Sequence, residues 1–166
     1  MEHPHLDPDK RQTAMSSWWI DEPLVLGSSN PTTGQLKELY QQGFRSIISL
    51  LDEREQSPHY DIEEVGEMGF RRFSIPVKDF SAPRPDDFRA FLEAIHHVLN
   101  EGKVLVHCEA GLGRTGTMAA AYWIDKGLSV NEAIRKIRRS NPGVIGSVDQ
   151  EYSLYELEAL ISSRAV

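Results

Sequence analysis

Residues 107–117, with the sequence HCEAGLGRTGT, constrain the fold of this chain more than any other stretch. An apolar run, residues 104–106, precedes this segment, and an alanine-rich apolar run, residues 118–124, follows it. The pattern predicts a buried strand, a glycine-containing turn and the start of a helix, in that order. Such a turn directs several backbone N–H groups into one small space, beside the positive end of the helix dipole. The segment is therefore expected to bind an anion.

Two side chains in this segment indicate phosphate chemistry. Cys108 is expected at the end of the strand and near the helix dipole, where the thiolate form of a nucleophilic cysteine is favoured. Arg114 follows after five intervening residues, and its planar guanidinium can bind two phosphate oxygens at once. Gly111 and Gly113 permit positive φ angles and close approach of the backbone to the anion. Thr115 offers a hydroxyl that is expected to stabilise the sulfur as a leaving group.

The spacing of His-Cys, five residues and Arg-Thr-Gly resembles the signature of the cysteine-dependent protein tyrosine and dual-specificity phosphatases. The resemblance extends over about residues 18–160 and is strongest over residues 104–150, where it is most similar to the small atypical dual-specificity phosphatases and the mitotic-exit phosphatases. It implies a phosphocysteine intermediate, with no cofactor and no metal. It also implies that the P-loop, residues 108–114, binds the phosphate through Glu109, Ala110, Gly111, Leu112, Gly113 and Arg114.

A general acid is needed as well, because the leaving oxygen of a phosphate ester must receive a proton. Asp79 is the preferred candidate: it lies on a proline-containing segment between a predicted strand and a predicted helix. This acid loop, residues 78–85, resembles the mobile acid-bearing loop of dual-specificity phosphatases. Asp86 and Asp87 compete for the role, although the sequence Pro85-Asp86 is also typical of a helix N-cap at Asp86.

Two further residues are expected to support the P-loop. The resemblance implies that His107 is buried and orders the loop through hydrogen bonds, without acting as the base. A Cys/His dyad of the protease type is the rival interpretation, but it leaves Arg114 and the glycines without a role. Gln150 resembles the glutamine that approaches the loop in this superfamily and helps to position the hydrolytic water. The basic run at residues 135–139 either attracts anionic substrates or forms a solvated helix face.

The order of apolar segments predicts an α/β fold. Strands that alternate with helices, followed by a run of helices, favour a central, mainly parallel β-sheet flanked by helices, with the P-loop between the last core strand and a helix. Residues 1–14 are predicted to be a polar tail, and residues 15–166 a single catalytic domain. Two short edge strands, split by Pro23, are expected at residues 18–20 and 24–27. Further strands are expected at residues 45–51, 70–77 and 103–107, and helices at residues 31–42, 60–68, 86–100, 114–126, 129–140 and 148–162.

Composition narrows the class of partner and the compartment. The net charge of −7 disfavours nonspecific binding to nucleic acid. The sequence contains no apolar run of membrane-spanning length, and its first twelve residues lack the apolar core of a secretion signal. The single cysteine excludes an intramolecular disulfide. These features predict a cytoplasmic protein without a nucleic-acid or membrane partner.

The predicted activity is hydrolysis of phosphotyrosine, and also of phosphoserine and phosphothreonine, in proteins or peptides. Phosphate, vanadate or similar oxyanions are expected to bind in the P-loop. An inositol phosphate or phosphoinositide substrate is an alternative, because Glu109-Ala110-Gly111 also occurs in the similar loop of cysteine phytases. The absence of lysine from the loop argues against it. A phosphate-recognition module without turnover is a further alternative, although nucleophile, arginine and acid are all present.

Overall fold

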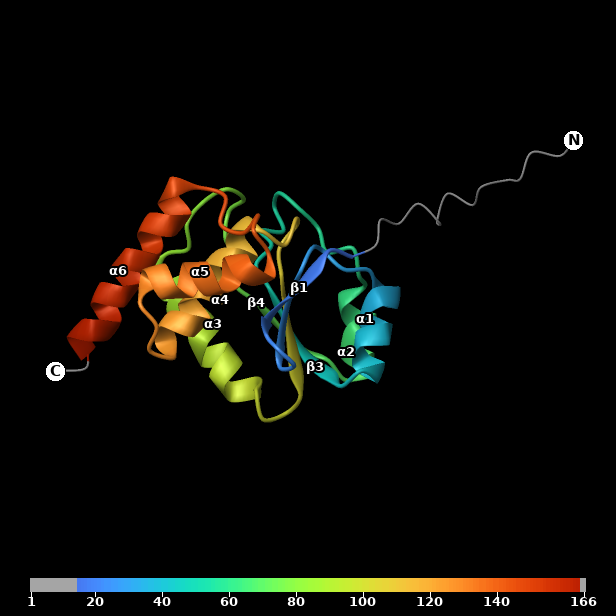
Figure 1. The fold of residues 1–166 in the computed structure, drawn as a ribbon. Coiled ribbons are helices and arrows are strands. Elements are labelled where there is room, and N and C mark those ends of the chain that lie inside the picture. The colour runs from blue at the N-terminus through green and yellow to red at the C-terminus, as the bar shows by residue number, and fades with distance from the viewer. Residues whose placement is uncertain (1–14, 165–166) are drawn as a thin grey trace, which may run out of the picture.

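The computed structural model describes residues 15–164, and within them a five-stranded sheet lies between two layers of helices (Figure 1). The predicted tail, residues 1–14, lies outside the described residues. The strands are β1 (Ser17–Asp21), β2 (Val25–Ser28), β3 (Phe44–Ser49), β4 (Arg71–Ser74) and β5 (Lys103–His107). The helices are α1 (Thr33–Gln41), α2 (Ile62–Met68), α3 (Pro85–Val98), α4 (Gly113–Asp125), α5 (Val130–Ser140) and α6 (Val148–Arg164).

The sheet has the strand order β1-β2-β5-β3-β4. Strand β1 pairs antiparallel with β2, and the other three pairings are parallel, which confirms the predicted mainly parallel sheet. The prediction that the second short strand lies at an edge is wrong, because β2 pairs with both β1 and β5 and all four of its residues are buried. Pro23 lies in the turn before β2, so its missing N–H removes no hydrogen bond from the strand.

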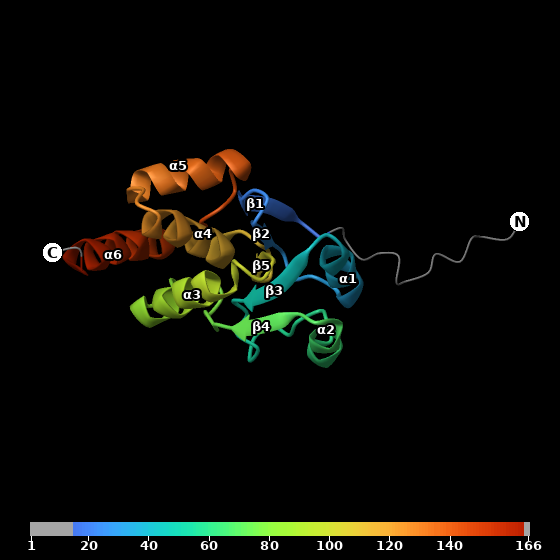
Figure 2. The same cartoon turned by 90° about the horizontal axis from the view of Figure 1, so that it is seen from below.

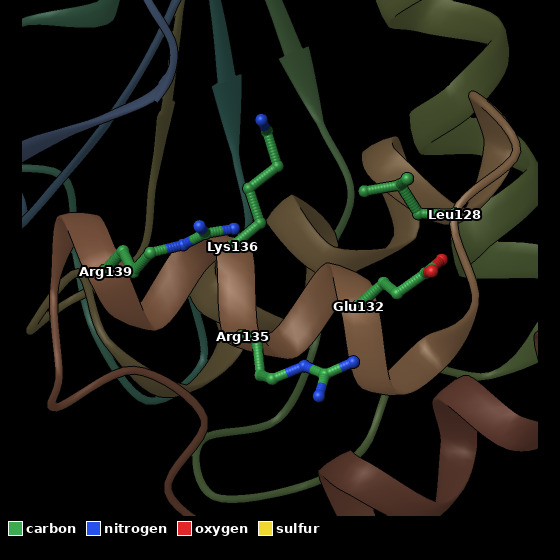
Figure 3. Close-up of a pocket in the computed structure, with 5 residues that line it drawn as sticks. All are labelled: Leu128, Glu132, Arg135, Lys136 and Arg139. Carbon is green, nitrogen blue, oxygen red and sulfur yellow. The ribbon is translucent and has the colours of Figure 1, made fainter.

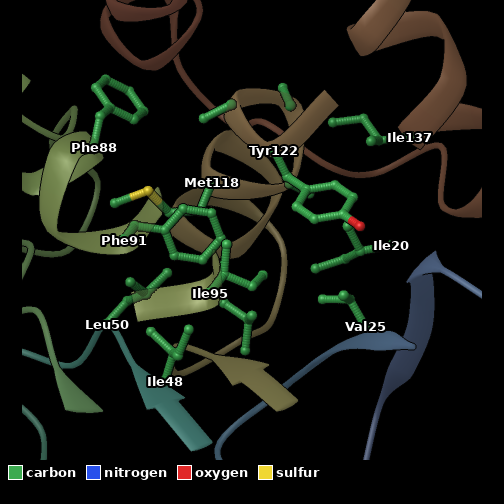
Figure 4. Packing of buried hydrophobic residues seen from close by; sticks show 14 of the residues in the cluster. Ile20, Val25, Ile48, Leu50, Phe88, Phe91, Ile95, Met118, Tyr122 and Ile137 are labelled. Carbon is green, nitrogen blue, oxygen red and sulfur yellow. The ribbon is translucent and has the colours of Figure 1, made fainter. Parts of the chain in front are cut away.

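Strand β5 lies at the centre of the sheet and is buried on both faces. Val104 and Val106 belong to the core on one side of the sheet, and Leu105 belongs to the core on the other side, as the period of two along a strand requires. Helices α3, α4, α5 and α6 cover the first face, and α1 and α2 cover the second (Figure 2). In the larger core, Phe91 and Ile95 of α3 and Met118 of α4 pack over the sheet (Figure 4). The carboxyl end of β5 is thereby held rigidly where the P-loop begins.

Most helix boundaries follow local signals in the sequence. Helix α5 begins with a capping box, in which Ser129 and Glu132 each accept a hydrogen bond from the other's backbone N–H. The N-cap prediction for α3 is wrong: Arg84 is the N-cap, and the Asp87 carboxylate accepts from its N–H at 2.8 Å. Proline occupies the first helical position there, which moves the boundary by two residues from Asp86. No helix within residues 15–164 combines the length and apolarity needed to cross a membrane.

Candidate active site

The sulfur of Cys108 lies at the start of the turn that joins β5 to α4. Its side chain is buried, and two donors approach the sulfur: the backbone N–H of Gly111 at 3.2 Å and the hydroxyl of Thr115 at 3.0 Å. Hydrogen bonds donated to sulfur stabilise its anionic form, which is the nucleophilic form of a cysteine. The local geometry therefore favours nucleophilic chemistry at this sulfur.

The turn itself depends on close backbone packing. Gly111 has a φ of +77°, and its carbonyl accepts a hydrogen bond from the indole N–H of Trp18 at 2.8 Å. A Cβ at this position would lie 2.5 Å from backbone atoms of Ser28 and Ser29. Gly113 starts α4 without a positive φ; a Cβ there would lie 3.0 Å from the amide of Gln150. Gly111 is thus needed both for its backbone conformation and because a side chain would clash with its neighbours. Gly113 is needed only because a side chain would crowd Gln150.

Arg114 is buried and makes three contacts through the end of its guanidinium. Its Nη1 donates to the carbonyl of Val77 at 3.0 Å, and its Nη2 donates to Oε1 of Gln56 at 2.8 Å. Oδ1 of Asp79 lies 3.1 Å from the same Nη2. Within the described part of the chain, Nε of Arg114 has no hydrogen-bond partner. The Nε edge of the guanidinium is therefore available to bind an oxyanion.

Among the three candidate acids, the structure brings Asp79 to Arg114 and holds the other two elsewhere. Both carboxylate oxygens of Asp79 accept hydrogen bonds, Oδ2 from Gln56 at 2.8 Å and Oδ1 from the N–H of Phe80 at 3.0 Å. Asp86 points to solvent, with its side chain 88% exposed and paired with Arg89 at 3.4 Å. Since Asp87 caps α3, Asp79 is the carboxyl group that can reach a phosphate on Arg114.

His107 is fully buried, and its ring does not contact the sulfur. Its Nδ1 donates to the carbonyl of Cys108 at 3.2 Å, so Nε2 accepts from the hydroxyl of Tyr60 at 2.8 Å. Burial is the main cause that lowers the pKa of His107 to about 3, so the ring is neutral at neutral pH. Arg72 in turn donates to the Tyr60 oxygen at 2.8 Å. This arrangement orients the backbone at the nucleophile and leaves no Cys/His dyad.

Gln150 is buried beside the P-loop, as its sequence context suggests. Its Nε2 donates to the carbonyl of Ser81 on the acid loop at 3.3 Å, and its Oε1 accepts from the N–H of Gly146 at 3.0 Å. The N–H of Ile145 donates to the carbonyl of Leu112 at 3.3 Å. The segment before α6 therefore contacts the P-loop through Ile145, and the first turn of α6 contacts the acid loop through Gln150.

The side chain of Glu109 is held at the outer side of the P-loop. Its Oε2 accepts from the amide of Asn30 at 3.0 Å, and its Oε1 lies 3.8 Å from Nε2 of His59. The backbone N–H of Asn30 also donates to the carbonyl of Glu109 at 2.9 Å. The side chain and backbone of this residue are thus both fixed by the segment that follows β2.

Four residues that build the site were not predicted from the sequence: Trp18, Asn30, Gln56 and Tyr60. Each comes from a segment far from the P-loop in the chain, and none stands in a recognisable motif. One signal was available for Asn30 and Gln56. They follow β2 and β3, the two strands that flank β5, and functional residues gather at the carboxyl ends of parallel strands.

The basic run lies on α5, on a different surface. A hollow of about 580 Å³ is lined there by Leu128, Glu132, Arg135, Lys136 and Arg139 (Figure 3). No P-loop residue lines this hollow. Arg138 instead donates to the carbonyl of Val144 at 3.4 Å, which ties α5 to the segment before α6. Among residues 15–164, no three His, Cys, Asp or Glu side chains are placed to share a metal ion.

Comparison with known proteins gives a consistent result. Residues 24–128 match the family described as "Polymorphic toxin system, DSP-PTPase phosphatase". The chain is 32% identical to Tyrosine-protein phosphatase CDC14 of Candida albicans over 128 residues, which cover 76% of this chain and 23% of that protein. It is likewise 32% identical to the CDC14 homolog of Schizosaccharomyces pombe over 100 residues, or 60% of this chain and 19% of that one. The chain thus spans about a fifth of the length of these curated relatives.

Solved structures extend the similarity to the fold. The structure of Tk-PTP in its active form is 33% identical, with a TM-score of 0.79, covering 87% of this chain and 97% of that one. The fold also resembles that of PTPMT1 in complex with PI(5)P, with a TM-score of 0.80 at 23% identity over 90% of this chain and 99% of the other. The sequence match, the fold and the Cys108–Arg114 geometry agree: this chain belongs to the DSP-PTPase family of cysteine-dependent phosphatases.

Proposed function

We propose that this protein hydrolyses phosphate monoesters on proteins or peptides, including phosphotyrosine, phosphoserine and phosphothreonine, through a phosphocysteine intermediate. One observation carries the proposal. The sulfur of Cys108 accepts two hydrogen bonds at the start of a loop that ends in Arg114, and Asp79 lies 3.1 Å from that arginine. The candidate nucleophile and the anion-binding arginine thus lie on one loop, and the candidate acid contacts that arginine.

In the first step the Cys108 thiolate attacks phosphorus, and an S–P bond forms as the ester P–O bond breaks. Asp79 transfers its proton to the leaving oxygen, and the free Nε edge of Arg114 and the loop N–H groups bind the equatorial oxygens. In the second step water attacks phosphorus, Asp79 accepts the proton, and the S–P electron pair returns to sulfur. The Thr115 hydroxyl stabilises the departing thiolate, and Gln150 helps to orient the water.

A protein substrate is favoured over a polyphosphorylated headgroup because of charge. Glu109 places a carboxylate next to the nucleophile in the chain, and its side chain remains 36% exposed. A second phosphate beside this carboxylate would be repelled. A phosphoinositide is the second candidate, and it is supported by the similarity of the fold to a phosphatase crystallised with PI(5)P.

The same proposal covers the setting in which the protein works. We assign residues 15–166 to a single catalytic domain. The assignment is supported by the two hydrophobic cores, which lie on opposite faces of the same sheet. A cytoplasmic location fits a nucleophilic thiolate, which needs a reducing compartment. Phosphate and vanadate are proposed to bind in the P-loop as product and as product analogue. The chain's net charge of −7 continues to disfavour nucleic acid and anionic membranes as partners.

The proposed function is tested with a substrate panel. Purified protein is assayed against p-nitrophenyl phosphate, phosphotyrosine and phosphothreonine peptides, a phosphoinositide and inositol hexakisphosphate, with Cys108→Ser as the control. We expect activity on the aryl phosphate and the peptides, and none by Cys108→Ser, because the hydroxyl is a far weaker nucleophile than a thiolate. Wild-type turnover by Cys108→Ser contradicts the mechanism, and activity confined to the inositol compounds contradicts the substrate class.

A further inference from the structure

Gln56 lies in a turn at the carboxyl end of β3, the strand that pairs with β5. The turn is rigid for local reasons. The N–H groups of Glu55 and Gln56 both donate to the carbonyl of Asp52, at 2.9 and 3.0 Å. Arg54 donates to both oxygens of the buried Asp52 carboxylate, at 3.0 and 2.9 Å, and this interaction lowers the pKa of that carboxyl. The backbone of Gln56 is therefore held beside the edge of the sheet where the P-loop begins.

The side-chain amide of Gln56 uses both of its ends. Oε1 accepts from Nη2 of Arg114, and Nε2 donates to Oδ2 of Asp79, each at 2.8 Å. An amide is suited to this position because it carries an acceptor and a donor together, whereas a carboxylate lacks the donor and an ammonium lacks the acceptor. Gln56 thus joins the residue that binds the phosphate to the residue that supplies the proton.

Neighbours of Gln56 fix the turn on two sides. On one side, the carboxylate of Glu55 accepts from the backbone N–H of Asp79 at 3.3 Å. On the other side, the carbonyl of Ser57 accepts from the amide of Asn30 at 2.9 Å, and this amide also donates to Glu109 in the P-loop. The turn is therefore anchored to the acid loop and to the P-loop before any substrate binds.

We propose that Gln56 is the positioning residue for the general acid Asp79, an inference that rests on the proposed phosphatase function. The Asp79 side chain is 30% exposed and stands on a loop. Without Gln56, Oδ2 loses its hydrogen bond and only the contacts of Oδ1 with Phe80 and Arg114 hold the carboxyl group, so the orientation of Oδ2 toward the leaving oxygen is no longer fixed. General acid catalysis requires hydrogen-bond distance to that oxygen. Arg114 keeps its contact with the carbonyl of Val77 when Gln56 is changed. Loss of Gln56 is therefore expected to impair proton transfer more than phosphate binding.

The test compares two substrates of similar shape that differ in their need for an acid. p-Nitrophenyl phosphate has a good leaving group, and phenyl phosphate has a poorer one. The variants are Gln56→Met, which removes both contacts, and Gln56→Glu, which keeps an acceptor for Arg114 but has no donor for Asp79. Since general acid catalysis contributes roughly 10²–10⁴-fold, we expect kcat on phenyl phosphate to fall by about 10–10²-fold in both variants. On p-nitrophenyl phosphate, with less demand for an acid, we expect a fall of less than about 3-fold.

A double-mutant comparison separates positioning from a general structural effect. In an Asp79→Asn background, Gln56→Met is expected to cause no further loss on phenyl phosphate, because the group it positions is already absent. The matched control is Gln41→Met, on the exposed face of α1, with unchanged rates on both substrates.

Two outcomes decide against the proposal, and a third concerns only its premise. Equal losses on the two aryl phosphates show that Gln56 acts through Arg114 or through folding, and they overturn the proposal. Additive losses in the Asp79→Asn background overturn it as well. A wild-type protein that hydrolyses neither compound instead refutes the phosphatase function itself.

Discussion

Gly111→Ala is a sensitive perturbation of the P-loop because the glycine meets two separate demands. Its φ of +77° lies in the left-handed region, and an added Cβ would lie 2.5 Å from the carbonyl carbon of Ser28 and from the nitrogen of Ser29. These are backbone atoms at the end of β2, a strand that is paired on both sides. The neighbouring chain therefore cannot yield as a flexible side chain would.

The expected loss of stability follows from adding the two costs. The left-handed conformation costs an L-residue about 1–2 kcal/mol, and overpacking against a rigid neighbour costs about 1–3 kcal/mol. The free energy of unfolding should therefore fall by about 2–5 kcal/mol. The rate on p-nitrophenyl phosphate should fall by at least about 10-fold, because the N–H of Gly111 donates to the Cys108 sulfur and cannot keep that place if the backbone shifts.

Urea denaturation measures the stability change, and Gly127→Ala is the matched control. Gly127 has a φ of +105°, but nothing lies within 4 Å of its Cβ position. The control therefore isolates the conformational cost, about 1–2 kcal/mol. The difference between the two variants in lost free energy of unfolding measures the cost of the steric clash with the end of β2. If both variants lose the same stability, the argument from close packing at the P-loop is refuted.

The remaining predictions concern the acid and the buried imidazole. Asp79→Asn should slow hydrolysis of phenyl phosphate by about 10²–10⁴-fold, whereas Asp86→Asn, at a side chain 88% exposed, should leave it unchanged; the opposite pattern makes the assignment of the acid wrong. In the folded state the pKa of His107 is about 3, so the ring is neutral. In the unfolded state its pKa is about 6.5, so below pH 6.5 a proton binds to the unfolded state in preference to the folded state. Its contribution to stability is complete above pH 6.5 and is lost as the pH falls toward 3. Between pH 7 and pH 5 the cost is about 2 kcal/mol, measured by urea denaturation at both pH values. A His107→Gln variant should lose this part of the pH dependence, and an unchanged slope contradicts the prediction.

The sequence by itself determined the elements whose signals are local. The P-loop is contiguous, so its strand, turn and helix start could be predicted together with Cys108 and Arg114. The continuous apolar run at residues 104–106 indicated a buried strand, and Ser129 with Glu132 marked the start of α5. In each case the physical cause acts between residues a few positions apart, which is why a pattern in the sequence records it.

Only the tertiary structure decided which distant residues complete the site. The interior position of β2 depends on its pairing with β5, and Pro23 gave no indication of it. The order of the strands brings the carboxyl ends of β2, β3 and β5 to one edge, and so places Asn30 and Gln56 beside the P-loop. Contacts of this kind form between side chains that are remote in the chain, and they depend on strand order and register. No local periodicity or spacing carries that information, so folding alone brings Gln56 between Asp79 and Arg114.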